Sequence, residues 1–340
     1  MEGTALNEAE AILDPGLPII DAHHHIWNAA HGKFDYLMPD LLADAGSGHN
    51  IVDSVYCECK SMFREDGPVE LRPVGETEFV LDAIERGGPE ATHLFGGLVM
   101  YADLMLGAGV QRVIDAHRDI AGDRLKGIRN IAAHDPSPLI RSFVPHAGML
   151  AEPALREGTA CLARNGLVFE TFVFHPQLDE VAALARAQPE LTIIVVGVGG
   201  PLGVGPFKGR RQEVFDTWRA ALKRLAVQPN VNIQIGAFGA KMMGLGFHTC
   251  ERRPDTETYA KVWSPYVDAC LDAFGPARCM FTSNYPEDRS SISYRQLWNV
   301  YKYICRDLSD ADRRRVFSGT AANLYKLPVQ EAGIDRKDIQ

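Results

Sequence analysis

Residues 18–27 read PIIDAHHHIW, and the three consecutive histidines in this segment are the strongest chemical signal in the sequence. They follow a short apolar run of the kind that forms a buried strand. In an extended backbone, His23 and His25 point to one side and His24 points to the other. Neutral imidazoles are common ligands of zinc, so His23 and His25 are suited to bind one divalent ion. Taken singly, a histidine at the end of a strand is more often a structural core residue than a metal ligand.

Other polar residues stand where further apolar runs end. Glu58 follows VYC, Arg129 lies in KGIRN, His175 follows FVF, and Asn284 and Asp288 lie in MFTSNYPED. We expect His175 to join His23 and His25 at one site, and Arg129 to bind an anionic group of a substrate.

Two of these residues have simpler interpretations. Glu58 could pair with Lys60 or Arg64, and Arg129 could be a buried ion-pair partner. Lys60, Arg64 and His248 are further candidates for substrate binding, and His248 lies where a lid or pocket wall is expected.

The elements that position these residues are eight short apolar runs separated by amphipathic segments. The expected strands are Leu17–Asp21, Ile51–Cys57, His93–Met100, Leu125–Ile131, Leu167–Phe174, Leu191–Val196, Val231–Ile235 and Arg278–Phe281. Expected helices include 178–187, 211–229 and 309–325, the last with a Ser-x-x-Asp cap. Eight such units without a break in composition predict an α/β protein with a single (β/α)8 barrel, whose strand ends carry the chemistry.

A doubly wound sheet is the competing fold. Its glycine-rich dinucleotide loop would follow the first strand, where this chain has DAHHH. The glycine-rich segment GVGGPLGVGPFKG at 197–209 lacks the Lys-Ser/Thr ending of a phosphate loop, so we interpret it as a folded active-site loop.

Composition narrows the class of protein. The 340 residues carry a formal net charge of −9 and no block of basic residues, which argues against nucleic-acid and anionic-membrane partners. The first sixteen residues lack the basic start and apolar core of a signal peptide. Seven scattered cysteines favour free thiols in a reducing compartment. We therefore expect a cytoplasmic enzyme, and the sequence leaves homo-oligomer formation open.

The ordered set IIDAHHHIW, VYCECKSMFRE, KGIRN, FHPQL, VGGPLG and MFTSNYPED resembles the amidohydrolase superfamily, specifically its amidohydrolase-related branch of lactonases and decarboxylases. The resemblance spans residues 17–327 and leaves 1–16 as an extension and 328–340 as a tail. It implies His23, His25 and His175 as metal ligands. It also implies Arg129 as a contact for a substrate carboxylate and Glu58 as a second-strand acid.

Two positions depart from the family pattern. Relatives carry a histidine where this chain has Gly197, and metal-dependent members carry an aspartate where it has Asn284. Both usual proton-transfer groups are thus replaced, which leaves Glu58 and Asp288 as candidate bases. If the glycine leaves a space the size of an imidazole, a Gly197→His substitution should raise turnover. If Gly197 has a backbone conformation that only glycine tolerates, the substitution should instead cost stability.

The resemblance implies a hydrolase that opens a lactone or a similar carboxylated ring with water activated at the barrel mouth. One zinc-like divalent ion is the expected cofactor, and metal-independent catalysis remains an alternative. A metal-assisted decarboxylase, or a barrel that binds a small acid without turnover, are the other two interpretations.

Overall fold

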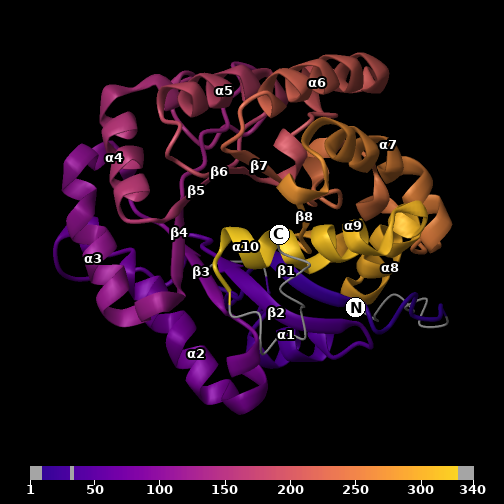
Figure 1. Cartoon of the computed structure of the whole chain (residues 1–340), viewed down its shortest axis with the longest axis horizontal. Coiled ribbons are helices and arrows are strands. Elements are labelled where there is room, and N and C mark those ends of the chain that lie inside the picture. The colour runs from indigo at the N-terminus through magenta and orange to yellow at the C-terminus, as the bar shows by residue number, and fades with distance from the viewer. Residues whose placement is uncertain (1–9, 31–33, 328–340) are drawn as a thin grey trace.

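Eight parallel strands form the centre of the computed structural model, which describes residues 10–30 and 34–327 (Figure 1). The strands lie side by side in chain order from β1 to β8. Their bounds are β1 (Pro18–His24), β2 (Asn50–Cys57), β3 (Gly97–Met100), β4 (Leu125–Arg129), β5 (Val168–Thr171), β6 (Ile193–Val195), β7 (Val231–Ile235) and β8 (Cys279–Phe281). Each expected apolar run overlaps one of these strands, which confirms the predicted single (β/α)8 barrel.

The first and last strands meet at their carboxyl ends. The His25 amide donates to the Tyr285 carbonyl at 2.8 Å, and the Asn284 amide donates to the His23 carbonyl at 2.9 Å. These two bonds bring the histidine segment and the segment after β8 to the same end of the barrel.

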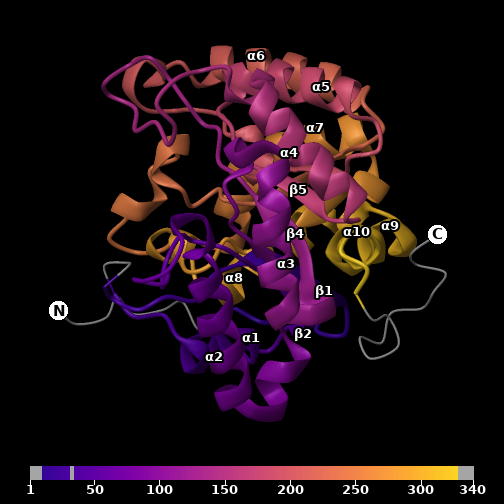
Figure 2. The same ribbon diagram turned by 90° about the vertical axis from the view of Figure 1, so that its left-hand side faces the viewer.

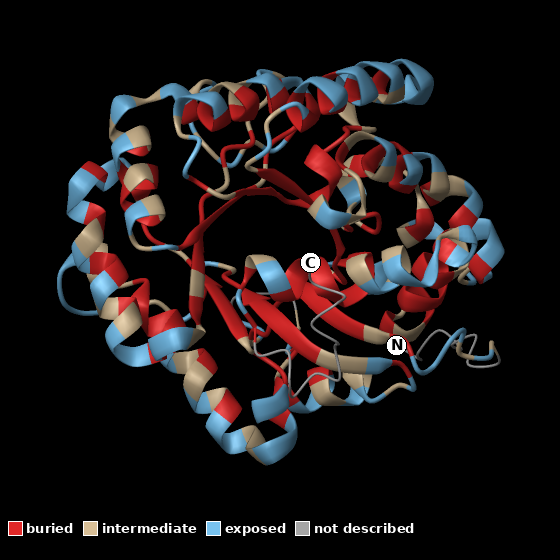
Figure 3. Ribbon diagram, in the orientation of Figure 1, coloured by how far each residue is buried: buried red, intermediate tan, exposed pale blue. Residues whose placement is uncertain are grey.

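Helices surround the barrel and present their exposed faces outward (Figures 1 and 3). Their bounds are α1 (Met38–Ala45), α2 (Val74–His93), α3 (Val110–Ala121), α4 (Pro153–Arg164), α5 (Leu178–Ala187), α6 (Arg211–Ala226), α7 (Thr256–Phe274), α8 (Tyr294–Ile304), α9 (Asp310–Arg314) and α10 (Thr320–Leu324). None of the helices in the described ranges is long and apolar enough to cross a membrane.

The strands have two buried faces, as parallel strands covered by helices require. The outward face packs against the helices in the largest apolar cluster, whereas the inward face forms a separate cluster inside the barrel. Residues of α10 and the turn after it, including Tyr325, belong to this inner cluster. The helix α10 and residues 325–327 therefore close the end of the barrel where the strands begin, whereas the histidines lie at the carboxyl end of β1 (α10 is seen in Figures 1 and 2).

Several predicted boundaries are wrong by a few residues, and two of these differences have a clear structural reason. The third strand begins at Gly97 and not at His93, because α2 continues to His93. The first strand extends to His24 because His24 still pairs with Tyr56 of β2. The segment 309–325 is helical as predicted: Ser309 caps it, and a π-helical turn at 315–319 joins α9 to α10 without a break in the helical backbone.

The predicted extension at residues 1–16 is described from residue 10 onward, and this part packs on α8. The Leu13 amide donates to Asn299 Oδ1 at 2.9 Å, and Lys302 Nζ donates to the Asp14 carbonyl at 2.8 Å. Residues 1–9 and the predicted tail at 328–340 lie outside the described residues.

Candidate active site

The histidine segment has the predicted alternation of side chains. His23 and His25 lie together, with ring centroids 4.9 Å apart, whereas His24 points away and contacts Ser54 Oγ at 2.8 Å. Burial, reinforced by the charge of Arg129, holds the pKa of His23 well below its usual value. Burial and the neighbouring His23 do the same for His25. Both imidazoles are therefore neutral at pH 7.

Hydrogen bonds fix the tautomer of both rings. His25 Nδ1 donates to the Cys57 carbonyl at 2.7 Å, and a carbonyl can only accept. His23 Nδ1 donates to Gln234 Oε1 at 3.0 Å, while the Gln234 amide nitrogen faces the Ala22 carbonyl and the Tyr325 hydroxyl. Each Nε2 atom therefore carries the lone pair that a metal-binding histidine needs, although Arg129 Nη1 already donates to that of His23 at 3.3 Å.

Glu58 and Arg129 form a buried ion pair beside His23. Arg129 is the last residue of β4, and its Nε donates to Glu58 Oε1 at 2.7 Å. Its Nη2 also donates to the Glu58 carbonyl, and its Nη1 lies 3.3 Å from His23 Nε2. Three of the five guanidinium N–H groups are thus used and two remain.

Glu58 is held by its backbone as well. Its amide donates to the Val99 carbonyl at 2.8 Å, which extends the pairing between β2 and β3 by one residue. The side chain is fully buried, and Oε2 has no hydrogen-bond partner among the described residues. A buried carboxylate oxygen without a partner is costly, so this atom is a candidate contact for a bound water or substrate.

A network that the sequence analysis missed lies beneath His23. Tyr325 donates to Glu170 Oε1 at 2.5 Å, and Gln234 links both residues to His23. Burial raises the pKa of Glu170 to about 7 and that of the Cys57 thiol well above its usual value. The available signal was a large polar residue inside an otherwise mostly apolar strand: Glu170 in VFET and Gln234 in VNIQI.

This network contains the group of three potential metal ligands that stands out among the described residues. Atoms of His23, Cys57 and Glu170 lie within 4.8 Å of one another. His25 and His175 are not members of that group, so the predicted triad of His23, His25 and His175 stays a prediction.

His175 has different surroundings from the other two histidines. The Leu202 amide donates to its Nδ1 at 3.4 Å, so the neutral ring carries its proton on Nε2. The ring packs on Phe207, with centroids 5.2 Å apart, and lines a cavity of about 310 Å³ together with residues of α5 and α6. Burial lowers the pKa of His175 to about 4. Ligation through Nε2 would require this residue to change tautomer.

The predicted partners of Glu58 have other contacts. Arg64 pairs with Glu78, and Lys60 Nζ lies 4.2 Å from the centre of the Tyr101 ring. His248 is half-buried in the turn Phe247–Thr249 after β7. Substrate binding by Lys60, Arg64 and His248 stays a prediction.

Asp288 is fully buried, and both of its oxygens accept hydrogen bonds. Asn284 Nδ2 donates to Oδ1 and the Gly239 amide donates to Oδ2, each at 2.8 Å. An aspartate at position 284 would place a second carboxylate against Asp288, which gives a physical reason for the amide found there. Asp288 therefore orients Asn284, and of the two candidate bases only Glu58 has an open oxygen.

The protonation of Asp288 gives a testable pH dependence. Burial raises its pKa to about 7, so the folded chain binds a proton that the unfolded chain releases near pH 4. This contribution to stability is complete below about pH 4 and is lost as the pH rises to about 7. We expect Asp288→Asn to lower Tm strongly at pH 5 and less at pH 8. In the control Asp307→Asn, whose parent side chain is exposed, the Tm difference from the parent protein should be the same at pH 5 and pH 8. If the Tm difference of Asp288→Asn were also the same at both pH values, the raised pKa of Asp288 would be contradicted.

Gly197 has a backbone reason to be glycine. Its φ is +61°, in the left-handed region, and the following Val198 has a φ of +51°. A Cβ atom at Gly197 would lie 3.3 Å from Ala237 Cβ and 3.6 Å from the Phe172 ring. Neighbouring side chains therefore already lie close to the position of a Cβ atom at residue 197. Together with the positive φ, this favours the interpretation that Gly197 is needed for its backbone conformation, and not that it leaves room for an imidazole.

We expect Gly197→His to destabilise the fold by at least about 1–2 kcal/mol, the cost of a left-handed non-glycine residue. Gly209 is a matched control, because its φ is +79° and a Cβ there would meet nothing within 4 Å. Gly209→Ala should show the conformational cost alone, and Gly197→Ala should lower Tm further. A Gly197→His variant with unchanged Tm and higher kcat/KM would instead support the missing-base interpretation.

Known proteins resemble this chain in sequence and in fold. The family model described as Amidohydrolase matches residues 20–327. An uncharacterized protein of Sinorhizobium fredii is 30% identical over 92% of this chain and 99% of its own length. An L-fucono-1,5-lactonase of Burkholderia multivorans is 31% identical over 91% of this chain and 96% of its own length. A zinc-bound amidohydrolase structure from Burkholderia multivorans has a TM-score of 0.69 at 24% identity, covering 92% of this chain and 100% of the other.

Proposed function

The chain belongs to the amidohydrolase family and is an enzyme of that superfamily, and from this premise we propose that it opens a small anionic lactone by hydrolysis. The observation that carries the proposal is the group of His23, His25, Glu58 and Arg129 at the carboxyl ends of β1, β2 and β4. The lactonase relative supports a lactone as the substrate class.

We assign each residue of the group a role. The two free N–H groups of Arg129 bind the substrate carboxylate or the lactone carbonyl oxygen, which gains negative charge as water attacks. Glu58 Oε2 accepts the proton of the attacking water. Glu58 is oriented for this by the ion pair through Oε1, because the guanidinium prevents the carboxylate from turning.

His23 and His25 would hold a divalent ion through their Nε2 atoms, if Arg129 Nη1 released its contact with the His23 nitrogen. Glu58 stays outside this donor set, because it forms no group of three ligands with the two histidines among the described residues. Such an ion polarises a carbonyl and lowers the pKa of a bound water. The zinc in the Burkholderia structure supports a metal of this kind. The donors beneath His23 are less suitable, because Cys57 is a protonated thiol that already contacts Glu170.

Metal content distinguishes these two donor sets. We expect the purified protein to carry less than one zinc per chain, since two neutral histidines bind weakly without a full ligand set, and chelators should remove it readily. His25→Ala should abolish zinc binding, measured by elemental analysis and by titration of the apoprotein. Cys57→Ser should retain it. Loss of zinc in Cys57→Ser but not in His25→Ala would move the site to the lower cluster.

The reaction is tested by a screen of sugar-acid and carboxylated lactones. Acid release in a pH-stat should identify a substrate, and NMR should show the ring-opened hydroxy acid. Release of CO₂ without ring opening would indicate the decarboxylase alternative, and tight binding without product would indicate a non-catalytic barrel. The free thiols of the seven cysteines support our further proposal that the enzyme acts in a reducing, cytoplasmic compartment.

A further inference from the structure

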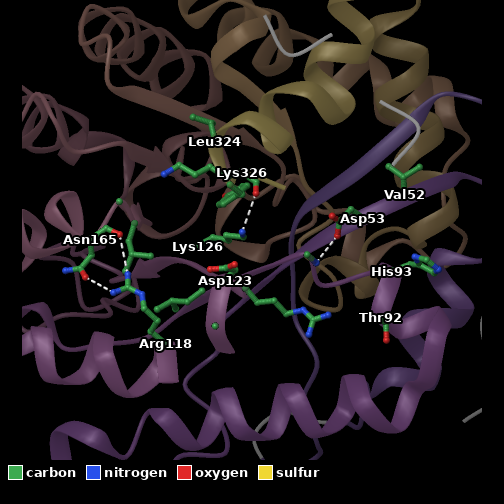
Figure 4. Close-up of a pocket in the computed structure, with 17 residues that line it drawn as sticks. Val52, Asp53, Thr92, His93, Arg118, Asp123, Lys126, Asn165, Leu324 and Lys326 are labelled. Carbon is green, nitrogen blue, oxygen red and sulfur yellow. Dashed lines mark hydrogen bonds between the residues drawn. The ribbon is translucent and has the colours of Figure 1, made fainter. Parts of the chain in front are cut away.

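A second cavity, of about 680 Å³, lies at the opposite end of the barrel from the histidines (Figure 4). Its walls come from the amino ends of β2, β4 and the turns before β3 and β5, and from the residues after α10. We call it the basal pocket. Its polar lining residues are Asp53, Thr92, His93, Arg118, Asp123, Arg124, Lys126, Asn165, Tyr325 and Lys326.

Positive charge predominates in the basal pocket, although the chain as a whole has a net charge of −9. The pocket has two acidic lining residues, Asp53 and Asp123, and four basic ones: Arg118, Arg124, Lys126 and Lys326. Figure 4 shows Lys126 and Lys326 together at the centre of the pocket, where Lys126 Nζ donates to the Lys326 carbonyl at 3.3 Å. Because the chain as a whole is acidic, this cluster of basic side chains must be stabilised by something within or bound to the pocket.

Helix ends account for one of the four cations. The helices α2, α3 and α4 end near the basal pocket, and their carboxyl termini attract positive charge. Arg118 binds the carboxyl end of α4, because its two terminal nitrogens donate to Asn165 Oδ1 and to the Asn165 carbonyl. The Arg118 guanidinium is therefore already engaged within the protein.

The other three cations have no short-range ion-pair partner among the described residues, although Asp53 attracts Arg124 and Lys126 from a greater distance and Asp123 also attracts Lys126. No described carboxylate lies within ion-pair distance, 4.0 Å, of Arg124, Lys126 or Lys326. Asp53 is bound instead by the backbone amides of Ser54 and Gly96, at 2.7 and 2.8 Å. Burial lowers the pKa of Lys126, so its charge is maintained at a cost.

We propose that the basal pocket is a binding site for a small multivalent anion, with Arg124, Lys126 and Lys326 as its ligands. Guanidinium and ammonium groups bind phosphate and carboxylate oxygens through charge-assisted hydrogen bonds. The volume of the pocket accommodates a molecule larger than a single phosphate ion. The site does not depend on the proposed lactonase activity, because it lies at the other end of the barrel.

Calorimetric titration of the full chain at low ionic strength tests the site, with inorganic pyrophosphate and citrate as separate probes. We expect one pyrophosphate per chain, and Arg124→Gln/Lys126→Gln should weaken binding by at least about tenfold. The matched control removes two exposed cations of α6, Arg219→Gln/Lys223→Gln, and should change affinity less than about twofold, since exposed charges act weakly through solvent.

The two probes distinguish the chemical source of the anion. Tighter binding of pyrophosphate indicates a phosphate ligand, and tighter binding of citrate indicates a polycarboxylate, and either result supports the site. Circular dichroism and Tm confirm that the variants fold. Absence of binding by both probes, or equal weakening in the pocket variant and the α6 control, would overturn the proposal.

Discussion

Replacing Glu58 by glutamine should lower kcat for lactone hydrolysis by about 10²- to 10⁴-fold, the usual contribution of a positioned general base. Glutamine keeps the shape of the side chain and one oxygen for Arg129 Nε, but its amide cannot accept the proton of a water molecule. The loss should therefore fall on kcat, with KM changed by no more than about threefold.

The control for this prediction is Glu78→Gln, which also removes one glutamate paired with an arginine but lies on the surface. Its kcat should be close to that of the parent enzyme. If Glu58→Gln raised KM and left kcat unchanged, Glu58 would be a substrate-binding residue and the base would have to be sought elsewhere. A pH profile in which the acidic limb disappears in Glu58→Gln would support its role as the base.

Replacing Arg129 by methionine should reduce the free energy of unfolding by about 3–5 kcal/mol, because it leaves the buried Glu58 carboxylate without its counter-ion. The pair is almost inaccessible, with side-chain exposures of 9% for Arg129 and 0% for Glu58. Solvent therefore cannot compensate for the missing partner. Urea denaturation of parent and variant measures the loss.

The double variant Arg129→Met/Glu58→Gln separates the ion pair from the packing of the two side chains. Removing both charges should restore a large part of the stability lost in Arg129→Met, because no uncompensated buried charge remains. Both variants should be inactive under the proposed mechanism. A double variant no more stable than Arg129→Met would mean that the arginine acts mainly through packing and its bond to the Glu58 carbonyl.

These two predictions and the metal experiment test different parts of the site. Glu58 and Arg129 can be essential whether or not an ion is bound, since neither role uses a metal. Retained activity after complete removal of zinc would leave the ion pair as the catalytic centre, with Arg129 supplying the positive charge.

The fold could be predicted because its signals are local. Eight apolar runs of strand length, separated by segments of helical periodicity, are properties of short windows of sequence. Helix α5 has the predicted bounds, 178–187, and the opposite orientations of His23 and His24 follow from the period of a strand. A strand boundary was predicted wrongly where the preceding helix continues further than expected: α2 extends to His93, where the third strand was predicted to begin.

What the sequence by itself determined is therefore the barrel, the histidine pair and the strand ends at which chemistry occurs. Only the tertiary structure decided which side chains are partners there. It paired Glu58 with Arg129, 71 residues away, and not with its neighbours Lys60 and Arg64. It also placed Gln234 behind His23, across 211 residues. Hydrogen bonds form between atoms that barrel closure brings within about 3 Å, and sequence distance does not reveal that proximity.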